Sequence, residues 1–310
     1  MLLLGSDCAS GSKGGGMVAH ALETMLELSS LDLSCNTLGA EGACHLSPTL
    51  GRLSALTALN ISRNELGTEG AKALAAGLQQ LGAITSLDIS HNQMGDEGAV
   101  ELSRALAGHS NLFSLNIRSN GMGEAGWLAV AEAVTALPGL AVVNEWDGYW
   151  PLGAGLACKL EARAMLKTHD VGAPLVAAVL GRSAEKLVHL ELSANGLGDL
   201  GVTHLCRPLS ALTRLTFLDL RSNRIADEGA KALAGALVRM CNITGLNLSH
   251  NPLARGDCFA PLLPALATMT ALRELVLHDG LDGLCAQGMQ ERIAAAAPAT
   301  ARLVLSSTQG

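Results

Sequence analysis

Two stretches of the chain, LTALNISRNELGTEGAKAL at residues 56–74 and ITSLDISHNQMGDEGAVEL at residues 84–102, repeat one pattern at an interval of 28 residues. Each stretch has apolar residues at its first, fourth and sixth positions and an asparagine at its ninth. The same asparagine recurs at Asn36, Asn64, Asn92, Asn120, Asn195, Asn223 and Asn251. A fixed period that is kept over two separate runs indicates a repeat architecture.

The two halves of each repeat predict two different elements. In Leu59-Asn60-Ile61, apolar residues alternate with a polar one, which is typical of a short strand. The alanine-rich half at residues 69–78 is expected to form a helix. This helix opens with an acidic residue and a glycine, here Glu69-Gly70, and we expect the carboxylate to favour the helix N-terminus and the glycine to permit a tight turn into it.

Strands in a sheet lie about 4.8 Å apart, whereas packed helices lie nearer 10 Å apart, so a stack of such units must bend. The sequence therefore predicts an α/β solenoid shaped as a horseshoe, with parallel strands on the concave face and helices on the convex face. Because the pattern covers almost the whole chain, we expect a single domain over residues 1–310.

The pattern LxxLxLxxN followed by L-G-x-E-G-A-x-x-L resembles the leucine-rich repeats of the ribonuclease-inhibitor-like subfamily, which includes the C-terminal arrays of NLR sensors and the Ran GTPase-activating proteins. The resemblance implies that each repeat asparagine is buried and that its amide bonds to backbone groups of neighbouring loops. It also implies a protein-binding scaffold.

Composition limits the classes of partner and the cellular location that we expect. Nearly half of the residues (49%) are hydrophobic but only 2% are aromatic, as expected for a core that reuses small aliphatic residues. A net charge of -7 argues against nucleic acid or an anionic membrane as the main partner. Eight cysteines without a CxxC pair indicate free thiols and predict an intracellular protein, in the cytoplasm or with the cytoskeleton or a cilium.

The repeat is interrupted once. Gly148 takes the asparagine position of one repeat, and the next repeat asparagine, Asn195, follows 19 residues later than the regular interval requires. We predict a rim insertion at about residues 149–172, with a short helix over residues 155–167, followed by the regular helix near residues 173–182.

Aromatic residues, which are scarce elsewhere, gather at this interruption: Trp127, Trp146, Tyr149 and Trp150 lie within 24 residues. Tryptophan, tyrosine and arginine are favoured at the centres of protein interfaces. Alternatively, Trp146 and Trp150 fill the core where the regular turn is lost, and a structural role is the preferred interpretation for Trp127. The predicted partner-binding centre comprises Arg118, Asn144, Trp146, Tyr149, Trp150, Phe217, Asp219 and Arg221.

Motifs for chemistry are absent from the sequence. It contains no GxxxxGK[ST] phosphate loop, and no nucleophile can be paired with a base by spacing. His91, His250 and His278 stand in different repeats without a set of metal ligands around them. We therefore expect no enzymatic activity, no metal and no cofactor.

Three functional hypotheses remain open. The first is a recognition module that binds a protein partner through the concave face and the rim insertion, as a subunit of a larger assembly or as an NLR-like sensor repeat module. The second is a regulator of a small GTPase, and the third is an inhibitor of a ribonuclease. Neither end of the array shows a polar capping repeat, so we expect another subunit or further sequence to cover the ends.

Overall fold

Two compact units, the N-terminal unit Met1–Gly155 and the C-terminal unit Leu156–Gly310, make up the chain. The computed structural model describes residues 2–3, 11–137, 140, 142–144, 150–151, 159–161, 169–182, 185–253, 259–277 and 286–304. The expectation of a single domain over residues 1–310 stays a prediction.

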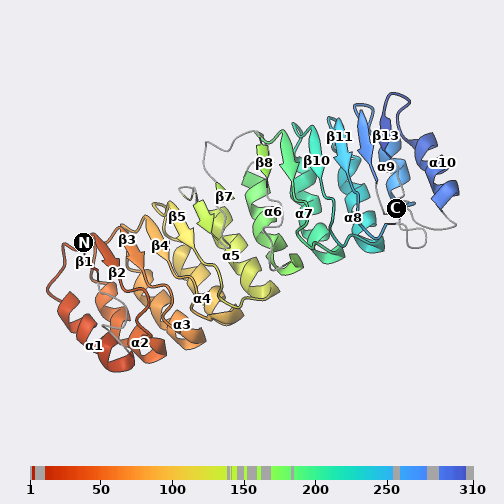
Figure 1. Cartoon of the computed structure of the whole chain (residues 1–310). Helices are drawn as coiled ribbons and strands as arrows, with labels where there is room; N and C mark the ends of the chain where they lie inside the picture. Colours follow the sequence, from red (N-terminus) through yellow and green to blue (C-terminus); the bar gives the residue numbers. More distant parts are fainter. Residues whose placement is uncertain are drawn as a thin grey trace. The chain divides into compact units, whose positions relative to one another are not determined.

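The N-terminal unit alternates strands and helices along the chain (Figure 1). Its strands form one sheet in sequence order, parallel except for the last pair, and its helices lie along one side of that sheet. The strands are β1 (Leu2–Leu3), β2 (Ser30–Asp32), β3 (Ala58–Asn60), β4 (Ser86–Asp88), β5 (Ser114–Asn116), β6 (Val142–Asn144) and β7 (Trp150–Pro151). The helices are α1 (Gly11–Leu22), α2 (Gly39–Leu50), α3 (Gly67–Leu78), α4 (Gly95–Leu106) and α5 (Glu124–Ala136).

The C-terminal unit repeats this arrangement with a sheet in which neighbouring strands all run parallel. Its strands are β8 (Lys159–Glu161), β9 (His189–Glu191), β10 (Phe217–Asp219), β11 (Gly245–Asn247), β12 (Glu274–Val276) and β13 (Arg302–Val304). Its helices are the 3-10 turn η1 (His169–Gly172), α6 (Ala173–Arg182), α7 (Asp199–Ala211), α8 (Asp227–Leu237), α9 (Leu262–Thr268) and α10 (Ala286–Ala296).

The predicted α/β class, with one short strand and one helix in each repeat, is confirmed. The interval of 28 residues reappears as strand register, since Leu59 pairs with Leu87 and Leu87 with Leu115. All three leucines are at most 2% exposed, because the middle residue of each strand points to the helices. The helix expected near residues 173–182 is also confirmed, as α6.

The helix predicted over residues 155–167 is wrong for residues 159–161, which form strand β8. Leu160 pairs with Leu190 of β9, so the segment continues the sheet of the C-terminal unit. The period-4 spacing of apolar residues that suggested a helix is outweighed here by backbone pairing with the open edge of β9. The other residues of the predicted helix lie outside the described residues.

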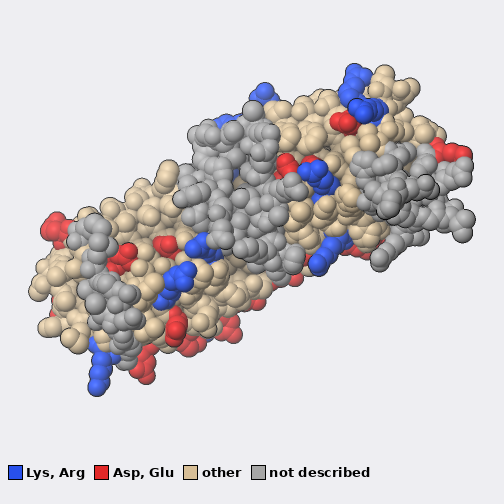
Figure 2. Space-filling model, viewed as in Figure 1, with Lys and Arg blue, Asp and Glu red and all other residues tan. Residues whose placement is uncertain are grey.

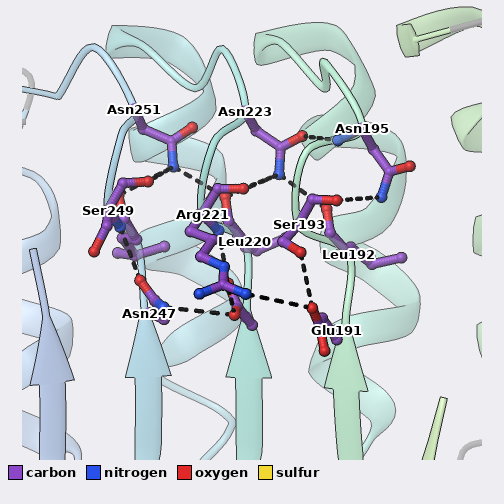
Figure 3. Close-up of polar contacts among 12 residues, drawn as sticks. Glu191, Leu192, Ser193, Asn195, Leu220, Arg221, Asn223, Asn247, Ser249 and Asn251 are labelled. Carbon is purple, nitrogen blue, oxygen red and sulfur yellow. Dashed lines mark hydrogen bonds and ion pairs between the residues drawn. The ribbon is translucent and has the colours of Figure 1, made fainter. Parts of the chain in front are cut away.

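A ladder of buried asparagines joins consecutive repeats (Figure 3). The Oδ1 atom of Asn223 accepts hydrogen bonds from the backbone N–H groups of Asn195 (3.0 Å) and Leu197 (3.1 Å). Its Nδ2 donates to the carbonyls of Leu192 (3.0 Å) and Leu220 (2.9 Å). The burial and backbone bonding that the resemblance implied for these asparagines are therefore confirmed.

The turns at these asparagines need support because they contain left-handed residues. Arg63 and Glu65, on either side of Asn64, have φ angles of 56° and 55°. Such a conformation costs a non-glycine residue about 1–2 kcal/mol. Glycine, which avoids this cost, takes the second of these positions at Gly121 and Gly196. The hydrogen bonds of the asparagine side chain thus stabilise a turn whose left-handed residues are unfavourable by themselves.

The glycine of the acidic-residue–glycine pair has a different role from the expected one. Gly70 lies inside α3, and a Cβ atom there would be 2.9 Å from Leu66 Cβ and 3.1 Å from Ala40 Cα. The glycine therefore allows neighbouring helices to pack closely, and a tight turn into the helix is not its function.

Three helices are capped by a carboxylate of the preceding repeat. Asp96 Oδ1 accepts hydrogen bonds from the N–H groups of Gly123 (2.6 Å) and Gly126 (3.0 Å) at the start of α5. Asp170 does the same for α7, and Asp199 accepts one from Ala226 at the start of α8. The carboxylates satisfy N–H groups that lack a partner within their own helix and favour its positive end.

Candidate functional site: a hollow on the strand face of the C-terminal unit

The first and third residues of each strand point away from the helices, and we call the surface they form the strand face. In strands β2 to β5 of the N-terminal unit, the side chains on this face are small and mostly polar. Asn60 Nδ2 donates to Asp32 Oδ2 (3.2 Å), and Asn116 Nδ2 donates to Asp88 Oδ2 (2.8 Å). Polar groups on this face therefore bond largely to one another across neighbouring strands.

The strand face of the C-terminal unit carries larger side chains around a hollow of about 350 Å³. This strand hollow is formed by strands β9 to β12 and the residues directly after them. It is lined by His189, Glu191, Phe217, Asp219, Arg221, Leu246, Asn247, Glu274 and Val276.

One wall of the strand hollow is aromatic. The rings of His189 and Phe217 stack with centroids 4.3 Å apart and planes inclined by 9°. On the next strand, a Cβ atom at Gly245 would lie 2.7 Å from Phe217 Cδ2, so the ring reaches over a position that has no side chain. Glycine, which is unfavourable within a strand, makes room here for the aromatic ring.

The other wall is charged. The guanidinium of Arg221 lies 3.3 Å from Asp219 Oδ2 through its Nε and 3.7 Å from Glu191 Oε1 through its Nη2. Figure 3 shows the Arg221 side chain directed toward Glu191, whose carboxylate also accepts a hydrogen bond from Ser193 Oγ (2.9 Å). The three charged side chains are therefore held in place by one another.

Asp219 is the buried member of this network. Its side chain is 5% exposed, whereas that of Arg221 is 38% exposed. Burial raises the pKa of Asp219 above its usual value, and the backbone N–H and positive charge of Arg221 act in the opposite direction. Arg221 thus stabilises a charge that would otherwise be costly inside the sheet.

Glu274 stands on the far side of Gly245 from Phe217, at the same register position. Within the described part of the chain, its carboxylate has no ion-pair or hydrogen-bond partner, although the side chain is only partly exposed. The lining of the strand hollow therefore contains three carboxylates and one guanidinium, and its net charge is negative.

Of the predicted site residues, the structure brings together Phe217, Asp219 and Arg221. Arg118 follows β5 in the N-terminal unit, and Asn144 ends β6, where its backbone pairs with Asn116. Trp146 and Tyr149 lie outside the described residues. Trp150 lies in β7, but its side chain is not described.

Sequence reasoning missed His189, Gly245 and Glu274 as parts of this site. His189 and Gly245 stand 28 residues before and after Phe217, so comparing strand positions repeat by repeat would have placed the three side by side. Trp127 is 2% exposed in α5, and its preferred structural interpretation is confirmed.

The described residues show few other features that would indicate a chemical function. No group of three or more histidine, cysteine, aspartate or glutamate residues among them could hold a metal ion. None of the helices described is long and apolar enough to cross a membrane. Burial raises the pKa of the Cys206 thiol to about 11. On the face seen in Figure 2, basic side chains lie scattered among acidic and uncharged ones.

Comparisons with known proteins agree with the repeat. A model of the family described as "Leucine Rich repeat" matches residues 28–44, 54–75, 84–103, 183–206 and 211–234. No curated protein matches the chain. Together with the strand–helix repeats described above, the family match shows that the chain contains leucine-rich repeats over these segments. Proteins with such repeats generally mediate protein–protein interaction and are typically non-catalytic.

Solved structures that match include an internalin from Listeria monocytogenes, at 15% identity and a TM-score of 0.36, covering 93% of this chain and 77% of that one. The leucine-rich repeat-containing protein LegL7 from Legionella pneumophila matches at 17% identity and a TM-score of 0.33, covering 91% of this chain and 84% of that one.

Proposed function

We propose that this chain is a non-catalytic recognition module that binds a protein partner through the strand hollow, as a subunit of a larger intracellular assembly. One observation carries the proposal. The strand hollow gathers an aromatic pair, a guanidinium and three carboxylates, whereas no such group occurs among the described residues of the strand face in the N-terminal unit, which is made mainly of small residues.

The physical case rests on preorganisation. Aromatic and arginine side chains supply much of the free energy of protein binding when they are rigid before the partner arrives. Phe217 is fixed by its stack with His189, and Arg221 is fixed by two carboxylates. Binding therefore orders few additional side chains, which lowers the entropic cost of association.

Several finer predictions belong to the same proposal. The predicted residues Arg118, Asn144, Trp146, Tyr149 and Trp150 also contact the protein partner. Placement in the ribonuclease-inhibitor-like subfamily is supported by the 28-residue period with one helix in each repeat. Action on a small GTPase and a sensor role stay predictions.

The test is a comparison of two matched variants. Phe217→Ala removes the ring from the strand hollow, and alanine is compatible with this strand position because Ala58 occupies it in β3. Phe113→Ala removes an equally large ring that is 56% exposed before β5 in the other unit. Chains carrying a photo-crosslinking residue at position 276 would be exposed to native extract, and crosslinked proteins identified by mass spectrometry.

We expect Phe217→Ala to abolish crosslinks that the wild type and Phe113→Ala both form. Circular dichroism would first establish that both variants are folded. Identical crosslinks for all three chains would contradict binding at the strand hollow.

A further inference from the structure

We propose that the strand hollow receives an arginine side chain of the protein partner, with its guanidinium seated between the ring of Phe217 and the carboxylate of Glu274. The inference rests on the proposed function, since it specifies what the partner presents to this site.

The charged side chains of the hollow favour a cation as its occupant. Three carboxylates line the hollow, and its one guanidinium, that of Arg221, is already paired with two of them, Glu191 and Asp219. The third carboxylate, Glu274, has no such partner among the described residues. An incoming cation would pair with Glu274 and reduce the net negative charge of the hollow, whereas an incoming carboxylate would meet like charge.

The space between the Phe217 ring and Glu274 favours a planar group. His189 covers the face of the Phe217 ring on the β9 side, which leaves the other face turned toward β11. There Gly245 has no side chain and the edge of the Phe217 ring extends over it, so the free part of the hollow beside the ring is bounded by Leu246, Asn247 and Glu274. Strands β10 and β12 are two strand spacings apart, about 10 Å. A flat group stacked on the ring at about 3.5–4 Å therefore also lies within reach of the Glu274 side chain.

Arginine fits both conditions better than lysine does. Its guanidinium is planar, stacks on aromatic rings, and presents paired N–H donors that match a carboxylate. The ammonium of lysine could make the ion pair with Glu274 but would not fill the slot beside Phe217. Asn247, whose Nδ2 lies 3.5 Å from Asp219 Oδ2, lines the floor and offers no competing positive charge.

The test starts with a random peptide library displayed on phage, selected on the wild-type chain and depleted on Phe217→Ala. The best peptide would be synthesised with its arginine and with citrulline, an uncharged side chain of nearly the same shape. Binding of both peptides would be measured by fluorescence anisotropy to the wild type, to Glu274→Gln and to Glu185→Gln. Glu185 is an exposed carboxylate of the same unit that does not line the hollow.

We expect one arginine in the selected peptides, and a loss of about tenfold or more on changing it to citrulline. Glu274→Gln should weaken the arginine peptide to a similar extent and leave the citrulline peptide unchanged, whereas Glu185→Gln should affect neither. Selected peptides without a basic residue, or equal binding of arginine and citrulline, would overturn the inference and leave the proposed function standing. A library that yields no peptide specific for the wild type over Phe217→Ala would overturn both.

Discussion

The asparagine ladder can be tested most directly by Asn64→Ala. Asn64 is fully buried, and its Oδ1 accepts hydrogen bonds from the backbone N–H groups of Asn36 (3.1 Å) and Leu38 (3.3 Å). Its Nδ2 donates to the carbonyls of Leu33, Ile61 and Ser62 at 2.8–3.0 Å. Alanine would remove all five bonds.

The cost comes mainly from the two N–H groups. Leu33 O keeps a bond from Asn36 Nδ2, and Ser62 O keeps one from the N–H of Cys35. A buried N–H that loses its acceptor costs roughly 1–3 kcal/mol, so two of them destabilise the fold by about 4 kcal/mol. In urea this corresponds to a midpoint lower by roughly 1–2 M.

Urea denaturation followed by circular dichroism would measure this change, with Asn60→Ala as the control. Asn60 lies only four residues away but on the strand face, where the groups that it bonds can reach water. Its replacement should cost about 1 kcal/mol or less. Equal destabilisation by the two variants would refute the assignment of the ladder as the main polar support of the turns.

Three further predictions concern other parts of the fold. Thr37→Gly should stabilise the chain by about 1 kcal/mol in the same urea assay, because Thr37 is β-branched at a φ of 49° and the equivalent position of another repeat is Gly121; a lower midpoint would contradict this. Asp96→Ala should destabilise it by about 1–2 kcal/mol through loss of the cap on α5, and an unchanged melting curve would show that the cap contributes nothing. With its pKa raised to about 11, the thiol of Cys206 should be ionised in roughly one molecule in a thousand at pH 8. Iodoacetamide should therefore modify the exposed Cys241 long before Cys206 in the folded chain, as peptide mass spectrometry would show, and equal rates would contradict the burial of Cys206.

The elements and their register could be predicted because the same core positions recur in every repeat. Leu59, Leu87 and Leu115 occupy equivalent core positions, and a single period places them all. Strand β8 was not predicted because its apolar residue, Leu160, fits a helical spacing equally well in isolation. Only its pairing with β9 decides between the two, and that pairing is a long-range contact.

The candidate site was predictable in part. Phe217, Asp219 and Arg221 were predicted, and Arg221 stands out because serine takes the equivalent position in other repeats, as at Ser62 and Ser90. Gly245 gave no such signal, because its contribution is the space that it leaves beside Phe217. Glu274 stands 29 residues after Gly245, so the strict interval points one residue short of it.

The two sets of bonds between repeats run in opposite directions along the chain. The turn of each repeat depends on an amide of the repeat that follows, as the N–H of Asn64 depends on Asn92. The starts of α5, α7 and α8 depend on a carboxylate of the repeat that precedes each of them, as α5 depends on Asp96. An interior repeat therefore cannot open without breaking bonds to both neighbours. Thermal opening should begin at the outermost repeats and advance inward, so that amide exchange slows toward the middle of each run.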